Sequence, residues 1–273
     1  ANLVYNDNCS ATVSYVISGA TVQSSTAGQV GTKTFNKGTS TITYTVTDGS
    51  GNSATASMTV TVNDQQAPSV TPPANITKNL TAGCTITISI PAATATDNCA
   101  VSAISYLISG ATSGSGTVLP ANKVFQKGVS VVTFTATDNS GNSSTATMTV
   151  TVLDTIKPTL SNVPSSSVVN ADLGLCSTSA TLTGVIYGDN CSATLSWATT
   201  GATVASGTGQ VLTRTYNVGV TTVTYTATDA SGNTATASLT ITVRDLQLPT
   251  ISAPANVTVA ADAGQCTASV AIL

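Results

Sequence analysis

Hydrophobic and polar residues alternate along three stretches of the chain, at Ile42–Val62, Val132–Val152 and Val223–Val243. In the third stretch valine, tyrosine and alanine fall on one face of an extended strand, and threonines fall on the other. A period of two with threonine on the polar face predicts half-buried antiparallel strands, and the link at residues 229–233, which contains Gly and Asn, predicts a hairpin. The three stretches are near copies of one another, so the chain is a repeat array.

Two short markers give the period of this array. The aspartates that open the three hairpin links are Asp48, Asp138 and Asp229, which are 90 and 91 residues apart. The tripeptide Asp-Asn-Cys also occurs three times, at intervals of 90 and 92 residues. A period near 90 residues is too long for a solenoid coil and is typical of one small β-sandwich per repeat.

Linkers that end in proline mark the boundaries between repeats, because proline cannot donate to a strand ladder. Short strands separated by turn signals predict an all-β fold of tandem immunoglobulin-like β-sandwiches in an extended array. In the incomplete first repeat, strands are expected at Ser14–Ile17 and Thr32–Phe35. The expected domains are a partial repeat at 1–64 without its early strands, complete repeats at 65–154 and 155–245, and the first strands of another repeat at 246–273.

The composition excludes several classes of function. Charged residues make up 7% of the chain, the net charge is −3, and the chain has neither histidine nor glutamate. The few basic residues are scattered, so we expect no nucleic-acid binding. No apolar run approaches the ~20 residues of a membrane span. Since nothing marks a general base or an activated nucleophile, we expect no enzyme and no catalytic residues.

The six cysteines are of two types. Cys9, Cys99 and Cys191 stand in Asp-Asn-Cys, whereas Cys84, Cys176 and Cys266 follow a turn that contains glycine. Regular pairs in a chain without histidine favour disulfides in an oxidising exterior over a zinc site. Because each complete repeat holds one cysteine of each type at the same short spacing, we expect the disulfides Cys84–Cys99 and Cys176–Cys191. Each would contribute roughly 3 kcal/mol in the chain-entropy model.

This scheme leaves Cys9 and Cys266 to pair outside the chain. An alternative scheme uses all six cysteines in bridges between adjacent domains, namely Cys9–Cys84, Cys99–Cys176 and Cys191–Cys266. Joined head to tail, the two ends of the chain restore nearly the spacing found inside a complete repeat, so we expect a segment of a longer repeat protein. The missing part of the last domain would come from the continuing polypeptide, which is the preferred interpretation, or from the next copy by strand donation.

Four motifs in this order resemble the hyalin repeat (HYR), an immunoglobulin-like module of extracellular and bacterial surface proteins. They are Pro-Ala-Asn-Val-Thr-Val at 254–259, Ala-Gly-Gln-Cys at 263–266, Ala-Thr-Asp-Asn-Cys at 95–99, and the hairpin sequence at 223–235. The resemblance covers essentially the whole chain. It implies adhesion or a structural stalk, with no chemistry. Threonine-rich arrays of this kind are similar to the giant cell-surface adhesins of Bacteroidota, including gliding adhesins.

The repeated aspartates of the turns and linkers make Ca²⁺ a candidate cofactor. Oxygen ligands that converge at a domain junction could bind Ca²⁺ and stiffen the array. The competing interpretation is that the aspartates serve turn chemistry, and we favour it because each linker carries a single aspartate. We therefore expect no cofactor, with Ca²⁺ as the alternative. The candidate ligands are the aspartates of the hairpin turns and linkers: Asp48, Asp64, Asp138, Asp154, Asp229 and Asp245.

The preferred function is a structural stalk or filament segment of an extracellular repeat protein, expected to be a cell-surface adhesin. Its partners would be neighbouring repeats of the same chain or the next copy in a filament, with surface glycans as further candidates. A glycan-binding repeat module and a subunit of a strand-exchanged filament are the alternatives. A glycan module would need exposed aromatic platforms, and Trp197, the only tryptophan, occupies the place of Tyr106 in a strand pattern typical of core packing.

Overall fold

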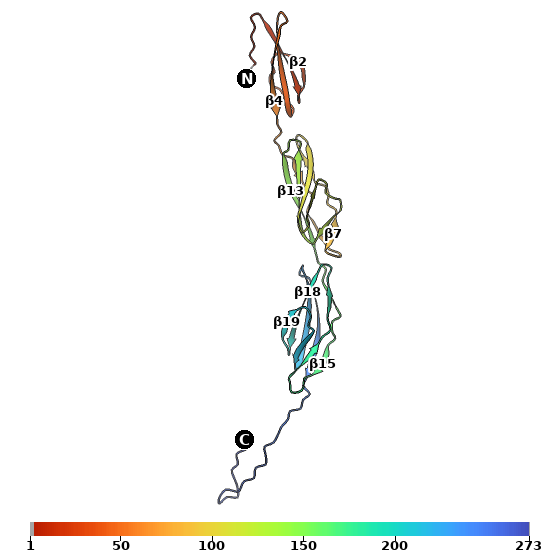
Figure 1. Cartoon of the computed structure of the whole chain (residues 1–273), viewed down its shortest axis with the longest axis vertical. Helices are drawn as coiled ribbons and strands as arrows, with labels where there is room; N and C mark the ends of the chain where they lie inside the picture. The colour runs from red at the N-terminus through yellow and green to blue at the C-terminus, as the bar shows by residue number, and fades with distance from the viewer. Residues whose placement is uncertain (1–2, 273) are drawn as a thin grey trace. The chain divides into compact units, whose positions relative to one another are not determined.

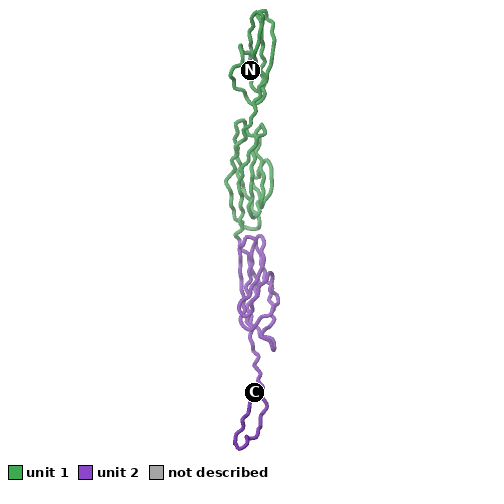
Figure 2. The backbone as a smooth tube through the Cα atoms, turned by 90° about the vertical axis from the view of Figure 1, so that its left-hand side faces the viewer, with its two compact units in different colours: residues 1–155 green, residues 156–273 purple. Residues whose placement is uncertain are grey.

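The structure, a computed structural model, describes residues 3–272 (Figure 1). It divides into two compact units, residues 1–155 and residues 156–273 (Figure 2). All regular structure in the described residues is β-strand, which confirms the all-β fold class with tandem immunoglobulin-like modules. The first unit contains module 1 (residues 3–63) and module 2 (64–155), and the second contains module 3 (156–245) and a C-terminal segment (246–272).

Module 2 has one five-stranded sheet and two separate strand pairs. Its strands are β5 (Ser69–Thr71), β6 (Ile76–Asn79), β7 (Thr85–Ile88), β8 (Thr94–Thr96), β9 (Val101–Gly110), β10 (Gly114–Gly116), β11 (Lys123–Gln126), β12 (Gly128–Asp138) and β13 (Ser143–Leu153). The sheet has the order β10-β9-β12-β13-β6, and the pairs are β11-β7 and β5-β8. Strand β6 runs parallel to β13, whereas the other pairs are antiparallel.

Module 3 repeats this topology. Its strands are β14 (Thr159–Ser161), β15 (Ser167–Asn170), β16 (Ser177–Thr181), β17 (Ile186–Gly188), β18 (Ala193–Gly201), β19 (Ala205–Thr208), β20 (Thr213–Asn217), β21 (Gly219–Asp229) and β22 (Thr234–Arg244). The sheet has the order β15-β22-β21-β18-β19, and the strand pairs are β16-β20 and β14-β17. The parallel partner of β22 is β15, in the place that β6 has in module 2.

Module 1 contains only the later strands of this topology within the described residues. They are β1 (Ala11–Gly19), β2 (Gln23–Ala27), β3 (Gly38–Asp48) and β4 (Ser53–Val62), in one sheet of order β2-β1-β3-β4. The strand expected at Thr32–Phe35 does not form, so that prediction was wrong. The equivalent strands β11 and β20 each pair with an earlier strand, β7 or β16, and module 1 has no such partner among the described residues.

The alternating pattern places the hydrophobic core where the sequence predicts it. Along β21 buried residues alternate with partly exposed threonines, so one face of the strand is apolar. In module 3 the core also includes Tyr216 of β20, which is fully buried against residues of β21 and β22. The second strand pair therefore closes the core over the five-stranded sheet, and a module without this pair keeps an open core.

The main hairpin of each module ends in the same aspartate-based turn. In module 2 the backbone N–H of Asp138 donates to the carbonyl of Asn142 at 3.0 Å, and Gly141 has a φ of 88°. The Asp138 Oδ1 accepts the backbone N–H groups of Ser140 at 2.7 Å and Asn142 at 2.9 Å. Glycine adopts a positive φ without strain, and the aspartate satisfies the remaining donors, so Asp-x-Ser-Gly-Asn folds locally into a tight turn.

The C-terminal segment forms no strand in residues 246–272, although the sequence pattern predicts the first strands of a module there. It does form one turn, in which the Asp262 N–H donates to the Thr267 carbonyl at 2.8 Å and the Gln265 N–H donates to the Asp262 carbonyl at 2.9 Å. Most of its hydrophobic side chains are exposed, including Ile251 and Ile272. None of the described residues forms a helix long and apolar enough to cross a membrane.

Candidate junction site around Asp64

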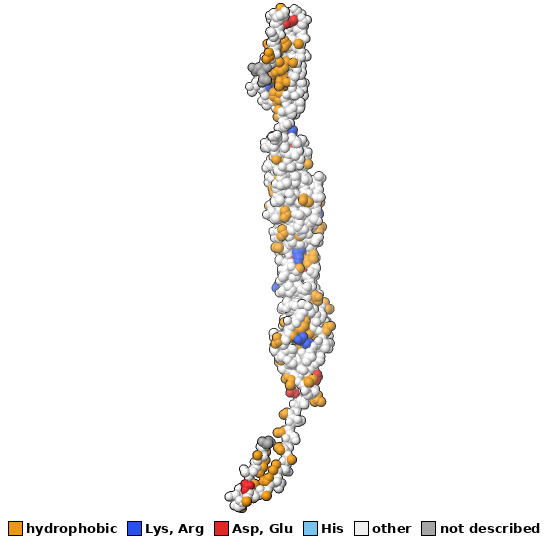
Figure 3. All heavy atoms as spheres, turned by 60° about the vertical axis from the view of Figure 1, so that its left-hand side comes forward, with side chains coloured by type: hydrophobic (Ala, Val, Ile, Leu, Met, Phe, Trp, Pro, Cys, Tyr) orange, Lys and Arg blue, Asp and Glu red, His pale blue; other side chains and the backbone are white. Residues whose placement is uncertain are grey.

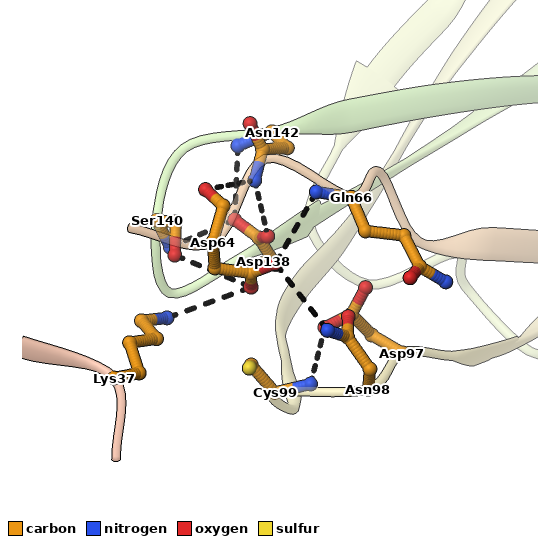
Figure 4. Close-up of polar contacts among 9 residues, drawn as sticks. All are labelled: Lys37, Asp64, Gln66, Asp97, Asn98, Cys99, Asp138, Ser140 and Asn142. Atoms are coloured by element: carbon orange, nitrogen blue, oxygen red, sulfur yellow. Dashed lines mark hydrogen bonds and ion pairs between the residues drawn. The ribbon is translucent and has the colours of Figure 1, made fainter. Parts of the chain in front are cut away.

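Three aspartates from separate parts of the first unit converge where the linker from module 1 enters module 2 (Figure 4). Asp64 lies in the linker after β4, Asp97 lies in the Asp-Asn-Cys loop before β9, and Asp138 ends β12. Each offers one carboxylate oxygen, and these oxygens lie within 4.8 Å of one another. The register of the sheet explains the proximity, because Val101 at the start of β9 lies opposite Asp138.

Asp138 is the most buried member of this group, with 2% of its surface exposed. Its Oδ2 accepts the side-chain amide of Asn142 at 2.8 Å, in addition to the two backbone N–H groups of the turn. Burial by itself would raise the pKa of Asp138, but the hydrogen bonds from Asn142 and Ser140 outweigh it and lower the pKa. The carboxylate is therefore held in its charged form by the turn that it closes.

Asp64 connects the two modules of the first unit. Its Oδ2 lies 3.7 Å from the Lys37 Nζ of module 1 and accepts the Ser140 hydroxyl of module 2 at 3.4 Å. Its backbone carbonyl accepts the side-chain amide of Asn142 at 3.1 Å, and its Oδ1 accepts the Gln66 N–H at 3.2 Å. The side chain of Asp64 is 3% exposed, so this ion pair is better shielded from solvent than a typical surface pair.

The Asp-Asn-Cys loop supplies the third side of the site. The Cys99 N–H donates to the Asp97 Oδ2 at 2.7 Å, which shapes the loop as an Asx turn. In one orientation, the Asn98 side-chain amide donates to Asp64 at 3.4 Å. In the flipped orientation, its nitrogen lies 3.1 and 3.3 Å from the two Asp97 carboxylate oxygens, and both the nitrogen and the oxygen of the amide have suitable partners. Burial and the hydrogen bond with Asp64 raise the pKa of the Cys99 thiol. Cys99 is therefore a protonated thiol beside the junction.

Three carboxylates are a ligand set that could hold a cation such as Ca²⁺, which takes six to eight oxygen ligands. Here, however, N–H donors and the Lys37 ammonium already satisfy much of their charge. Within the first unit, the structure brings together two of the expected calcium ligands, Asp64 and Asp138. Asp97 was missed as a site residue, although its recurrence in every Asp-Asn-Cys motif was a usable signal.

Three of the other candidate ligands, Asp48, Asp229 and Asp245, accept hydrogen bonds from residues of their own turn or linker. Asp48 closes the hairpin turn of module 1, and the Asn52 side chain and the N–H groups of Asn52 and Ser50 lower its pKa. Asp229 closes the turn of module 3 in the same way. Asp245 is exposed and accepts the Gln247 N–H at 2.9 Å, whereas Asp154 is 6% exposed. Turn chemistry is thus confirmed for the hairpin aspartates.

The cysteines do not pair as either sequence-based scheme predicts. Cys84 and Cys191 are disulfide-bonded, whereas Cys9, Cys99, Cys176 and Cys266 are free thiols. The predicted disulfides Cys84–Cys99 and Cys176–Cys191 were therefore wrong, as were the alternative pairs Cys9–Cys84, Cys99–Cys176 and Cys191–Cys266.

The physical reason for the first correction is that the two cysteines of module 2 lie at opposite ends of it. The Cys84 carbonyl accepts the Lys127 N–H at 3.0 Å, next to the start of β12, whereas Cys99 lies beside Asp138 at the end of β12. The eleven residues of β12 span about 33 Å at ~3.3 Å per residue. A disulfide requires Cα atoms within about 7 Å, so a bridge inside the module cannot form. In module 3 the Cys176 carbonyl likewise accepts the Val218 N–H at 2.9 Å, next to the start of β21.

Trp197 packs as a core residue. It lies opposite Tyr225 in the register of β18 and β21 and contacts the buried cluster of module 3. The Arg214 guanidinium lies 5.2 Å from the ring centroid, and a Cβ added at Gly207 would come within 2.7 Å of the ring. Arg214 and Gly207 thus lie against the ring, which leaves less of it free to stack on a sugar ring. The prediction of core packing is confirmed.

Module 2 also has an apolar depression of about 370 Å³. It lies between the loop after β7 and the loop after β10, over residues of β9 and β12. Its polar groups are few, and its lining contains no carboxylate or basic side chain. The residues that line it are Ile90, Ala92, Ala93, Ile104, Ser105, Tyr106, Thr117, Val118, Leu119, Ala121 and Phe134.

The repeated sandwich and its junction define a tandem-repeat protein built from immunoglobulin-like modules. The family model of the HYR domain matches residues 5–62, 63–152 and 153–243, which is most of the chain. The chain therefore belongs to the HYR domain family, and the family part of the sequence-based resemblance is confirmed.

Two curated relatives are sea-urchin hyalins. The chain is 35% identical over 159 residues to hyalin of Lytechinus variegatus, a match that covers 52% of this chain and 27% of that protein. It is 31% identical over 224 residues to hyalin of Strongylocentrotus purpuratus, with 78% of this chain and 17% of that protein covered. The chain thus spans less than a third of either relative.

The solved structures that match the chain share little sequence with it. Cadherin domains 3–6 of protocadherin gamma B2 match with a TM-score of 0.33 and 17% identity, over 86% of this chain and 68% of that one. A structure from a 1.5-MDa bacterial ice-binding adhesin matches with a TM-score of 0.36 and 18% identity, over 88% and 89%.

Proposed function

We propose that the chain is a segment of an extracellular stalk in an adhesion-type cell-surface protein, comparable in role to the repeat regions of giant bacterial adhesins. Its partners are neighbouring modules of the same kind, and its role is mechanical and not enzymatic. Membership of the HYR domain family and similarity to hyalins support the adhesion-type, extracellular part of this proposal. The packing of Trp197 against the core of module 3, with Arg214 and Gly207 against its ring, disfavours the glycan-binding alternative in that module.

The observation that carries the proposal is the role of Asp64 at the junction within the first unit. One carboxylate contacts Lys37 of module 1 and Ser140 of module 2, and the same residue accepts Asn142 through its backbone. A linker that was only a flexible tether would be expected to be polar, mobile and rich in glycine or serine. This linker is instead bonded to a side chain of module 1 and to the hairpin turn of module 2, so we expect it to restrict bending.

The proposal predicts that Asp64→Ala loosens the junction without unfolding either module. Residual dipolar couplings of backbone amides would report the alignment of modules 1 and 2 separately in the full chain. In the wild-type chain we expect the two modules to share one alignment tensor, and in Asp64→Ala we expect the tensors to differ in magnitude. Asp245→Ala is the matched control, because that aspartate also follows a last strand but is exposed, and its carboxylate accepts the N–H of Gln247 in its own linker.

Two results would contradict the proposal. Independent tensors for modules 1 and 2 in the wild-type chain would mean that the linker is a tether. Equal tensors in Asp64→Ala would mean that the contacts of Asp64 do not restrain the junction. A glycan array probed with the chain gives a separate check, since binding at micromolar concentration would favour the glycan-binding alternative.

A further inference from the structure

Module 2 differs from modules 1 and 3 in one short segment. Modules 1 and 3 carry Gly-Gln-Val at residues 28–30 and 209–211, whereas the equivalent residues 118–120 of module 2 are Val-Leu-Pro. The alignment needs no gap, because each segment leads at the same spacing to an aromatic residue. The difference changes both the backbone and the side chains at this place in module 2.

The glutamine of Gly-Gln-Val joins its segment to another part of the same module. In module 3 the Gln210 Oε1 accepts the Val185 N–H at 2.9 Å, and the Gln210 Nε2 donates to the Val185 carbonyl at 2.7 Å. In module 1 the Gln29 Nε2 donates to the carbonyl of Leu3, the equivalent of Val185, at 3.3 Å. A primary amide suits this place because it offers a donor and an acceptor side by side. We call this contact the glutamine latch.

A backbone hydrogen bond fixes the same segments. In module 3 the Gly209 N–H donates to the Leu195 carbonyl at 2.8 Å, and in module 1 the Gly28 N–H donates to the Val13 carbonyl at the same distance. Gly209 has a φ of 75° and Gly28 has a φ of 94°. Glycine adopts this region without strain, so Gly-Gln-Val can lie against the module.

Val-Leu-Pro cannot repeat this arrangement. A β-branched residue such as Val118 avoids a positive φ, and Leu119 has no amide to form the latch. Pro120 has no N–H and favours an extended conformation at the residue before it. Among the described residues of module 2, neither the latch nor the glycine bond has an equivalent. Pro120 is exposed, whereas its equivalent Val211 is 4% exposed and belongs to the core of module 3.

The apolar depression of about 370 Å³ lies where the latch would be in module 2. Its lining includes Ala93 and Leu119, which stand at the two ends of the latch in the other modules. It also includes the aromatic side chains of Tyr106 and Phe134. Small-molecule sites have volumes of about 300–1,000 Å³ and apolar linings with a few placed polar groups. The depression therefore has the size and lining of a ligand site.

The backbone at one end of the missing latch is placed alike in modules 2 and 3. Ala93 directly precedes β8, and Val185 directly precedes β17. Strand β8 pairs antiparallel with β5, just as β17 pairs antiparallel with β14. The N–H and carbonyl of Ala93 thus take the position of the groups that hold the glutamine amide in module 3.

We propose that this depression binds a small, uncharged molecule that carries a primary amide on an apolar body. The amide takes the place of the glutamine side chain, so that its oxygen accepts the Ala93 N–H and its nitrogen donates to the Ala93 carbonyl. The apolar body lies against Tyr106 and Phe134. The lining has no charged side chain, and Figure 3 shows few charged side chains on the face in view, so a neutral ligand fits best.

This site goes beyond the mechanical role, because a stalk needs no ligand. Benzamide is the probe, and methyl benzoate is its control, since the ester has a similar body and a carbonyl but no N–H donor. Each is titrated into the ¹⁵N-labelled full chain while backbone amides are followed by NMR. We expect a saturable shift at Ala93, with benzamide binding about 2- to 10-fold more tightly through its extra hydrogen bond. The amides of Val185 and Leu3 should not shift, because the latch occupies their site.

A combined variant restores the latch in module 2. Val118→Gly, Leu119→Gln and Pro120→Val together give it the Gly-Gln-Val of the other modules. We expect this variant to lose the benzamide-dependent shift at Ala93, because its own glutamine fills the site. Val124→Thr is the matched control, since it also introduces the residue of module 3 but lies outside the depression, and it should retain binding.

Three outcomes would overturn the proposal. They are the lack of a saturable shift at Ala93 in the wild-type chain, equal affinities for benzamide and methyl benzoate, and equal benzamide binding by the wild type and the restored variant. Unchanged amide signals of β12 and β13 would show that the restored variant is folded. If it does not fold, the comparison of the two probes in the wild-type chain still decides the question.

Discussion

The matched methionines of modules 1 and 2 give the sharpest test of the open core. Met148→Ala removes a side chain that is 1% exposed, and replacing a buried methionine by alanine costs about 2–5 kcal/mol through lost transfer energy and a residual cavity. Met58 is 50% exposed, and complete burial of a methionine is worth only about 1.5–3 kcal/mol. With half of that burial and no enclosed cavity, we expect Met58→Ala to cost about 1 kcal/mol.

Native-state hydrogen exchange resolves these costs module by module in the full chain. A free-energy change of about 1.4 kcal/mol corresponds to a tenfold change in an equilibrium constant. Met148→Ala should therefore speed the slowest amides of β12 and β13 by about 30-fold to 4,000-fold. Met58→Ala should speed those of β3 and β4 by about fivefold.

Equal destabilisation by the two substitutions in dilute solution would refute the reasoning. It would mean that Met58 is covered in the isolated chain and that the core of module 1 is closed.

Two further predictions concern module 2. Ser130 is fully buried, and its hydroxyl accepts the Thr112 N–H at 3.0 Å, so Ser130→Ala should leave this donor unsatisfied. We expect a loss of about 1–3 kcal/mol in the free energy of unfolding, measured by hydrogen exchange. Ser109→Ala, at an exposed position, is the control, and equal losses in the two variants would contradict the reasoning. The pKa of Asp138 is lowered on folding, so its contribution to stability is complete above the unfolded pKa near 3.9 and is lost as the pH falls through the folded pKa. The turn amides at 139–142 should therefore lose protection from exchange below about pH 4. Asp138→Asn should abolish this pH dependence.

The hairpins could be predicted from sequence because every determinant is local. Alternation assigns each residue of β21 and β22 to a face, and Asp229 closes the turn with its own side chain. The long strands need no distant partner to be identified, since each lies next to its hairpin mate. The position of Trp197 opposite Tyr225 also follows from this register.

The predictions that were wrong concern contacts between segments that sequence spacing does not show. Residues 32–35 alternate like a strand, but a strand exists only when another edge pairs with it. The close spacing of Cys84 and Cys99 in the sequence indicates a short loop, yet the segments between them cross the module and separate the two cysteines by its full length. Asp97 was missed because an Asx turn explains the motif and only the fold brings it to Asp64.

The same register explains why each module extends the chain instead of folding it back. Module 2 is entered at Asp64, beside Asp138 at one end of β12, and is left after Val152, which lies opposite Gly128 at the other end. Entry and exit are thus about 33 Å apart whatever angle a junction adopts. The two cysteines of module 2 lie at these two ends, so Cys84 and Cys99 cannot form a bridge within the module.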